Sequence, residues 1–209
     1  MSINKVINDG YCIGCGACAY KRNDVHMRWN KYGMLQPIGS IDDLDDYICP
    51  FSTTDNESAI ADSLFSNTSD IKFDNKVGYH QTLLAGYVKD NNYRDNASSG
   101  GITSWLLVQL MSKNLIDGVI HVGKSEKTDE LFSYSISHTL DDIKNKTRSQ
   151  YYPTSFSDAL TEVDVNKKYA IVGIPCYIKA VRLLCKKDAS LKEAIKFFIG
   201  IFCGHLKTK

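Results

Sequence analysis

Apolar and polar residues alternate along the second half of the chain in a pattern that predicts strands and helices in turn. Strands are expected over residues 79–89, 117–123, 131–138, 168–174 and 196–202. Helices are expected between them, over residues 102–115, 140–146 and 176–186, with a further helical turn from residue 191. The first of these helices is apolar on nearly all sides, which indicates burial. Strands that alternate with helices predict an α/β domain with a mixed sheet, in a chain that is α+β overall.

The first 76 residues show little of this alternation. Residues 1–11 are a short lead-in, and residues 19–48 mix charged and aromatic side chains. Residues 50–76 are rich in Ser, Thr, Asn and Asp, which predicts a linker or a short surface helix. We therefore expect a cysteine-bearing segment with its linker at 1–76, followed by the α/β domain at 77–209.

An acidic stretch stands just before Cys49. Its members are Asp42, Asp43, Asp45 and Asp46. We interpret this stretch as a solvated helical or turn face, and a docking surface for a basic redox partner is the alternative.

The charge of the whole chain is nearly balanced, with 25 Lys and Arg against 24 Asp and Glu and a formal net charge of +1. There is no basic excess to hold a phosphate backbone, so nucleic acid is not expected as a partner. Apolar stretches such as 105–111 and 197–202 are far shorter than a membrane span. We therefore expect a soluble, cytoplasmic protein, in a compartment where thiols stay reduced.

Three cysteines at two-residue intervals form the most informative motif. The sequence reads Cys12-Ile13-Gly14-Cys15-Gly16-Ala17-Cys18, and a fourth cysteine follows in Cys49-Pro50. A tight turn can aim three thiolates at one point, and the fourth can close the site from a distant loop. Glycines at 14 and 16 permit the backbone angles that a curl around a bulky inorganic core requires. The pattern is typical of a 4Fe-4S cluster of the ferredoxin type.

Two other arrangements compete with this interpretation. Zinc also takes four thiolates, but zinc ribbons usually pair two Cys-x-x-Cys units, so the run of three favours iron-sulfur. A disulfide framework is disfavoured, because seven cysteines is an odd number and no signal peptide is expected. A second cluster in the same run would need a cysteine where Arg22 stands, so the run predicts one cluster.

A serine and glycine stretch stands just before the predicted apolar helix, at Ser98-Ser99-Gly100-Gly101. Free amides, two hydroxyls and the positive end of a helix dipole make an anion site, which can hold the phosphates of a flavin or a nucleotide. A plain helix N-cap is the simpler alternative.

Two more cysteines follow predicted buried strands. Cys176 ends a Gly-Ile-Pro-Cys sequence at a helix start, where we expect a lowered thiol pKa, and Cys203 stands beside Gly204 and His205. If the two strands are neighbours, the two thiols converge at the strand ends and form half of a second metal site. A small core residue is the alternative for Cys176, and it is the favoured interpretation for Cys185, which lies within the helix.

An ordered series of motifs resembles one known family. The motifs are the cysteine run, Cys49-Pro50-Phe51, Tyr93-Arg94-Asp95-Asn96-Ala97-Ser98-Ser99-Gly100-Gly101, Ser149-Gln150-Tyr151-Tyr152-Pro153, Gly173-Ile174-Pro175-Cys176-Tyr177-Ile178-Lys179-Ala180 and Cys203-Gly204-His205-Leu206-Lys207. From residue 12 to its end, the chain resembles the family of coenzyme F420 hydrogenase/dehydrogenase beta subunits. The series is more specific than any one of its members.

The resemblance implies an iron-sulfur flavoprotein oxidoreductase that moves electrons between a ferredoxin-type cluster and FAD and on to an unidentified substrate. On this chain it implies a first cluster at Cys12, Cys15, Cys18 and Cys49, and a possible second 4Fe-4S cluster with ligands at Cys176 and Cys203. It also implies a flavin phosphate region at Ser98, Ser99, Gly100 and Gly101, with Ser149 and Tyr151 near the flavin. The implied partners are a ferredoxin-like redox protein and a small-molecule substrate.

The substrate stays open, because relatives of this kind use coenzyme F420 or chlorophyll-type pigments, or look associated with surface polysaccharide synthesis. Relatives with this beginning also look longer than 209 residues and continue into a region with further cysteines. We therefore expect the chain to be a fragment or to work with a separate chain, with residues 77–209 forming the N-terminal part of the family's α/β domain. An electron-transfer module without its own catalysis is the alternative to an enzyme, and a zinc-bound structural domain is a third interpretation.

Overall fold

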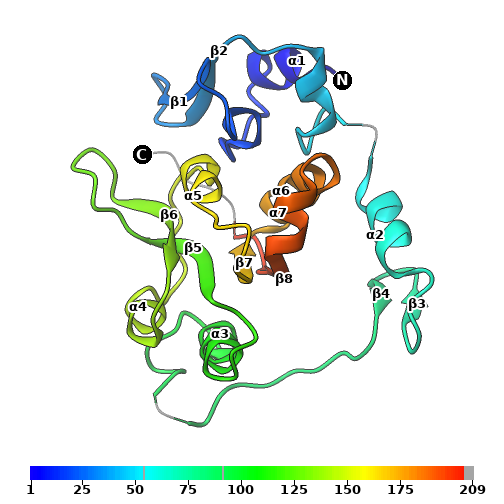
Figure 1. Cartoon of the computed structure of the whole chain (residues 1–209), viewed down its shortest axis with the longest axis vertical. Helices are drawn as coiled ribbons and strands as arrows, with labels where there is room; N and C mark the ends of the chain where they lie inside the picture. The colour runs from blue at the N-terminus through cyan, green and yellow to red at the C-terminus, as the bar shows by residue number, and fades with distance from the viewer. Residues whose placement is uncertain (54, 91, 205–209) are drawn as a thin grey trace.

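A four-stranded mixed sheet forms the frame of the second half of the chain, in the order β6-β5-β7-β8 (Figure 1). The computed structural model describes residues 1–53, 55–90 and 92–204, with residues 43 and 44 described by their backbone only. The strands are β5 (Gly118–Lys124), β6 (Phe132–Ser137), β7 (Tyr169–Gly173) and β8 (Ile195–Gly200). β5, β7 and β8 are parallel, and β6 pairs antiparallel with β5. The predicted α/β domain with a mixed sheet is confirmed.

Helices cover both faces of this sheet. On one face lie α3 (Ile102–Ser112) and α4 (Leu140–Asn145), and on the other lie α5 (Ser157–Thr161), α6 (Pro175–Lys187) and α7 (Ala189–Ala194). The period of two in β5 sends Val119 toward α3 and Ile120 toward α6, and both side chains are fully buried. The helices and strands predicted from residue 102 onward are therefore present, with ends that differ by a few residues.

The cysteine-bearing segment lies above the α6 face of the sheet (Figure 1). It contains α1 (Ile3–Asn8), the 3₁₀ helix η1 (Ala17–Ala19), an antiparallel hairpin of β1 (Val25–Trp29) and β2 (Leu35–Gly39), and the 3₁₀ helix η2 (Asp43–Tyr47). Its buried side chains, such as Ile3 and Val6, belong to the same apolar cluster as those of α5 and α6. Sequence analysis did not predict α1 or the hairpin.

The polar stretch after Cys49 contains α2 (Glu57–Phe65), followed by the short pair β3 (Lys72–Asp74) and β4 (Gly78–His80). The predicted short surface helix is therefore present. α2 docks on the outer face of α6 through charge, since Lys179 Nζ lies 3.2 Å from a Glu57 carboxylate oxygen. The guanidinium of Arg182 adds a cation–π contact, 5.9 Å from the ring centre of Phe65 on α2.

The strand predicted over residues 79–89 is wrong beyond His80. In the described part of the chain the segment from 81 to 90 pairs with no strand, and it runs across the bottom of Figure 1 toward α3. Leu83 is 64% exposed and Leu84 is 90% exposed. Apolar alternation predicted a strand here, but a strand forms only where a partner supplies hydrogen bonds, and β4 finds a partner for three residues only.

The interpretation of the acidic stretch as a solvated face is also wrong at Asp45. This side chain is buried, at 4% exposure for the residue, and it binds the guanidinium of Arg22 through both carboxylate oxygens, at 3.0 and 3.1 Å. A buried carboxylate needs such a partner, and here the pair links two distant parts of the cysteine segment.

Within the described residues, no helix combines the length and apolar character that a membrane crossing would need.

Asp188 links the cysteine segment to the corner between α6 and α7. Its carboxylate accepts hydrogen bonds from Lys21 at 2.8 Å and from the Tyr20 hydroxyl at 3.0 Å, and it caps α7 by accepting from the Leu191 N–H at 3.0 Å. The hydrogen bond from Lys21, followed by that from the Leu191 amide, lowers the pKa of Asp188 to about 2.

We predict that Asp188→Ala lowers the free energy of unfolding by about 1–2 kcal/mol at neutral pH, because it removes a helix cap and an ion pair. A carboxyl whose pKa is depressed on folding contributes stability that is present above its unfolded pKa of about 3.9. That stability is lost as the pH falls toward 2. Urea unfolding should therefore show a difference from the parent protein that shrinks across this window. Asp9→Ala, which removes an exposed ion pair with Lys5, is the matched control and should change stability by less than about 0.5 kcal/mol.

Candidate metal centre and cofactor region

Four cysteines from two distant segments line one cavity of the cysteine segment. Cys12, Cys15 and Cys18 come from the loop before and within η1, and Cys49 follows η2. Apolar side chains of α1 and the β1–β2 hairpin complete the wall. The four cysteines that were predicted to bind the first cluster therefore line the same cavity. In the described ranges, no three His, Cys, Asp or Glu side chains gather closely enough to hold a single metal ion.

The glycines of the loop have the backbone angles that the motif requires. Gly14 has φ +71° and Gly16 has φ +85°, both in the left-handed region that favours glycine. A Cβ on Gly14 would lie 2.8 Å from the Leu35 carbonyl oxygen in β2, and a Cβ on Gly16 would overlap the Ser155 hydroxyl. The loop is thus packed between the hairpin and the α/β domain, with no room for side chains at these two positions.

Residues of the α/β domain donate hydrogen bonds to backbone carbonyl oxygens of the cysteine loop. The Phe156 N–H donates to the Cys15 carbonyl at 3.0 Å, and the Tyr177 hydroxyl lies 3.1 Å from the Ile13 carbonyl oxygen. Both donors are buried, at 0% and 2% exposure. The position of the cysteine run is therefore set by residues far along the chain.

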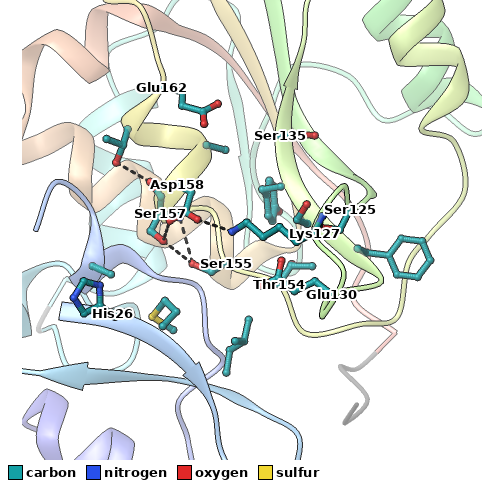
Figure 2. A pocket seen from close by; sticks show the side chains of 18 of the residues that line it. His26, Ser125, Lys127, Glu130, Ser135, Thr154, Ser155, Ser157, Asp158 and Glu162 are labelled. Carbon is teal, nitrogen blue, oxygen red and sulfur yellow. Dashed lines mark hydrogen bonds and ion pairs between the residues drawn. The ribbon is translucent and has the colours of Figure 1, made fainter. Parts of the chain in front are cut away.

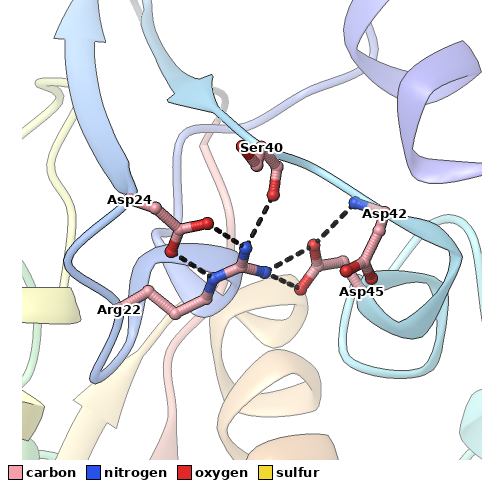
Figure 3. A network of polar contacts seen from close by, with 5 residues as sticks. All are labelled: Arg22, Asp24, Ser40, Asp42 and Asp45. Atoms are coloured by element: carbon pink, nitrogen blue, oxygen red, sulfur yellow. Dashed lines mark hydrogen bonds and ion pairs between the residues drawn. The ribbon is translucent and has the colours of Figure 1, made fainter.

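A charged network sets the position of Cys49 relative to the run (Figure 3). Arg22, four residues after Cys18, binds Asp45, four residues before Cys49, and it also binds Asp24 at 2.6 Å and the Ser40 carbonyl at 2.6 Å. These partners raise the pKa of the Arg22 guanidinium, with the hydrogen bond to Asp24 as the largest cause. Arg22 stands where two-cluster sequences have a further cysteine. Through its contact with Asp45 it keeps Cys49 close to the loop of the other three cysteines.

The environment of these thiols fits a positively charged inorganic group. Burial raises the pKa of Cys12 and Cys15, and it raises that of Cys18 to about 12. Hydrogen bonds from the Gly14 and Ala17 amides to the Cys12 and Cys15 thiols act in the opposite direction. Thiolates bind metals, so a bound cation must supply the charge that makes deprotonation favourable here. Four thiols, amide donors and an apolar shell together form a donor set suited to an iron-sulfur cluster.

Cys176 and Cys203 lie at the carboxyl ends of neighbouring parallel strands, since β7 pairs with β8. The Ile201 N–H donates to the Gly173 carbonyl at 3.0 Å and carries this pairing past the end of β8. The Cys203 thiol lies close enough to contribute to a raised Cys176 pKa. The expectation of a lowered Cys176 pKa is wrong, because burial outweighs the helix start as the largest influence. His205 lies outside the described residues, and Cys185 is buried in the core as expected.

The predicted flavin region gathers residues from two loops. The Ser98 hydroxyl accepts a hydrogen bond from the Ser149 N–H at 2.9 Å. Gly101 is the N-cap of α3 with φ +75°, and no side chain caps this helix, so neither Ser98 nor Ser99 serves as the plain cap that was the alternative. The Tyr151 ring is half-exposed and lies against Gly204, where a Cβ would come within 2.7 Å of it. Tyr151 thus lies beside the loop of Cys203.

An open cleft of about 1120 Å³ separates the cysteine segment from the edge of the sheet (Figure 2). One wall comes from η1 and β1, where His26 lies, and the other comes from β6, α5 and the loop before β6, from which Lys127 reaches Asp158 at 3.0 Å. Met27 lines both this cleft and the cysteine cavity, so the two spaces share a wall. Sequence analysis did not find the cleft, because its lining comes from several separate segments and none carries a local motif.

We predict that Gly16→Ala destabilises the protein more than Gly10→Ala. Both glycines have positive φ, at +85° and +79°, so each substitution introduces backbone strain of about 1 kcal/mol. Nothing lies within 4 Å of a Cβ at residue 10, whereas one at residue 16 overlaps Ser155. Urea unfolding should show losses of about 1 kcal/mol for Gly10→Ala and about 2–4 kcal/mol for Gly16→Ala. Equal losses would contradict the close packing of the loop against residue 155.

The relatives that match part of the chain include the following three. An uncharacterized protein of Methanocaldococcus jannaschii is 30% identical over 115 residues, which are 52% of this chain and 32% of that protein. The F420-dependent formate dehydrogenase subunit beta of the same organism is 26% identical over 55% of this chain and 30% of its own length. An F420H2 dehydrogenase subunit of Methanosarcina mazei is 28% identical over 53% of this chain and 31% of its own length. The match thus spans about a third of each relative.

A solved structure is similar in part. A chain of the F420-reducing [NiFe] hydrogenase complex from Methanosarcina barkeri aligns over 57% of this chain and 45% of its own, with a TM-score of 0.47 and 22% identity.

Two family models match in chain order. The model for the N-terminal part of the coenzyme F420 hydrogenase/dehydrogenase beta subunit matches residues 83–161, and the model for its C terminus matches residues 166–209. Together they cover more than half of the chain, including the predicted flavin region, Cys176 and Cys203. This chain belongs to the family of coenzyme F420 hydrogenase/dehydrogenase beta subunits.

Proposed function

We propose that this chain is part of an iron-sulfur flavoprotein oxidoreductase and that Cys12, Cys15, Cys18 and Cys49 hold one 4Fe-4S cluster. The observation that carries this proposal is the single cavity that all four cysteines line. The oxidoreductase class is supported by the family, whose members here include a formate dehydrogenase subunit and an F420H2 dehydrogenase subunit. When bound, the cluster supplies one-electron chemistry and FAD joins it to two-electron chemistry.

The role of the chain's own residues is to bind and orient. The amides of Gly14 and Ala17 donate to two of the thiols, and the apolar wall from α1 and the hairpin excludes water from the cavity. Hydrogen bonds to sulfur and exclusion of solvent are the means by which a protein sets the reduction potential of a cluster. Arg22 and Asp45 keep the fourth thiol in place.

We place FAD at the Ser98–Gly101 stretch, with Ser149 and Tyr151 beside it. Support comes from the exposed serines before an 11-residue helix without a side-chain cap, because its free amides and helix dipole favour a phosphate. The hydrogen bond between Ser149 and Ser98 joins the two loops that would contact the flavin. Cys176 and Cys203 supply two thiols for a second cluster, and Tyr151 lies beside the second of them.

The cleft in Figure 2 is our proposed site for the small-molecule substrate, because its volume suits such a ligand and it shares Met27 with the cysteine cavity. A redox protein is the proposed partner, in keeping with relatives that are named as subunits. The named relatives are subunits of dehydrogenases, which supports the redox class and gives no support to a role in surface polysaccharide synthesis.

An electron-transfer module without catalysis is the second candidate. One observation favours it: the first cavity draws four cysteines from this chain, whereas the second site has two cysteines in the described residues. FAD titration separates the candidates. Binding of one FAD per chain supports the flavoprotein, and no binding at micromolar FAD supports the module.

We predict that Cys15→Ala abolishes the visible absorbance and the iron and sulfide content of the first centre, since three thiolates from a buried set cannot retain the cluster in full. The matched control is Cys185→Ala, which also removes a buried thiol but lies in α6 outside the cavity, and it should keep the full iron content. Iron retained by Cys15→Ala at the parent level would mean that the ligand assignment is wrong.

A further inference from the structure

Tyr177 contacts both cysteine sites. Its chain position is directly after Cys176, and its backbone N–H hydrogen-bonds toward the Cys176 thiol as well as to the Ile174 carbonyl at 2.9 Å. Its hydroxyl lies 3.1 Å from the carbonyl oxygen of Ile13, between Cys12 and Gly14 of the first loop. The Tyr177 side chain therefore spans the distance from the start of α6, at the second site, to the backbone of the first loop.

The same hydroxyl also lies 2.6 Å from the carbonyl oxygen of Thr154. Thr154 belongs to the segment in which the Phe156 N–H donates to the Cys15 carbonyl at 3.0 Å. One phenol proton is thus shared between two carbonyl oxygens, the nearer on the segment that holds Cys15 and the other in the loop of Cys15 itself. Since the phenol is 2% exposed, water cannot easily replace it as the donor.

The ring of Tyr177 is held by two other buried aromatic rings. Tyr134 stacks on it with ring centres 5.9 Å apart and an interplanar angle of 18°, and Phe156 meets it edge-on at 5.7 Å. The hydroxyl of Tyr134 donates elsewhere, to the Val172 carbonyl in β7 at 3.1 Å. The two tyrosines are therefore alike in burial and packing but differ in what their hydroxyls bind.

Tyr134 and Tyr177 both lie near a thiol of each site. Burial is the largest cause of the raised pKa of Tyr134 and of Tyr177, and the thiols of both Cys15 and Cys176 raise each pKa further. Both phenols thus lie within electrostatic reach of a thiol of the first site and a thiol of the second.

We propose that Tyr177 is a positioning residue that joins the two cysteine sites: its hydroxyl holds the loop of Cys12, Cys15 and Cys18 against the start of α6 and tunes the centre that this loop binds. The inference rests on the proposed function, because it requires a cluster at the four-cysteine cavity. Loss of the hydroxyl leaves the buried Thr154 carbonyl oxygen and the partly buried Ile13 carbonyl oxygen without this donor, and it removes the positive end of a dipole next to the loop. The loop is then held by fewer hydrogen bonds. The reduced state of the centre, which is the more negative one, becomes less favourable, so the reduction potential falls.

The test compares Tyr177→Phe with Tyr134→Phe in the full chain, reconstituted with iron and sulfide without oxygen. The measurements are the reduction potential of the first centre, followed by its electron paramagnetic resonance signal, and the rate at which an iron chelator removes iron. Tyr177→Phe should lower the potential and speed iron release by about tenfold, the factor that matches loss of a buried hydrogen bond. Tyr134→Phe should change the potential by less than Tyr177→Phe does and alter the release rate by less than about twofold, since its hydroxyl donates to the Val172 carbonyl in β7 and not to the first loop.

Equal effects of the two substitutions on potential and iron release would overturn the positioning role and leave Tyr177 as a packing residue. If Tyr177→Phe loses the native circular dichroism spectrum, 3-fluorotyrosine in place of Tyr177 keeps the ring and makes the hydroxyl a stronger donor. The potential should then rise, and an unchanged or lower potential would overturn the inference. A parent protein that takes up no iron and sulfide would contradict the proposed function itself, which is a different outcome from an intact cluster that ignores Tyr177.

Discussion

The hydrogen bonds that the α/β domain donates to the backbone of the cysteine loop are the contacts on which the rest of the site depends. The Phe156 N–H and the Tyr177 hydroxyl reach the carbonyls of Cys15 and Ile13 from residues more than a hundred positions along the chain. Gly16 permits this approach, because any side chain there would overlap Ser155. A short loop that cannot bury a core of its own thereby gains a fixed shape from its neighbour.

Burial of the thiols has a cost that a cofactor offsets. Cys15 and Cys18 are buried and have raised pKa values, so as free thiols they are shielded from solvent and poorly disposed to ionise. A cationic inorganic core reverses that preference and, by binding the folded arrangement, adds its binding free energy to folding. The Arg22–Asp45 pair brings Cys49 to the same cavity, which links a structural ion pair to assembly of the centre (Figure 3).

Sequence reasoning succeeded where one residue pattern determined one structure. The buried strand with Ala170 and Ile171 and the apolar helix with Leu107 were predicted, because long apolar runs have few alternatives to burial. The glycines of the cysteine run were predicted for the backbone angles that they adopt. The prediction of a strand after His80 was wrong, because alternation of apolar and polar residues does not show whether a partner strand exists.

Local sequence patterns could not predict features that depend on residues far apart in the chain. Asp45 has the same charge as its neighbours, and only the guanidinium of Arg22, brought close by the fold, accounts for its burial. The same holds for Tyr177, whose role is visible only once its hydroxyl is seen beside Ile13. The cleft of Figure 2 likewise arises where β1 and β6 face each other.

The most direct test of the account is the content of iron, acid-labile sulfide and zinc per chain after anaerobic purification or reconstitution. A cluster at the four-cysteine cavity predicts at least about four irons with an equal number of sulfides, and about eight of each if the second site also assembles. Zinc without sulfide, or no metal at all, would contradict the central claim that the cavity of Cys12, Cys15, Cys18 and Cys49 is an iron-sulfur centre.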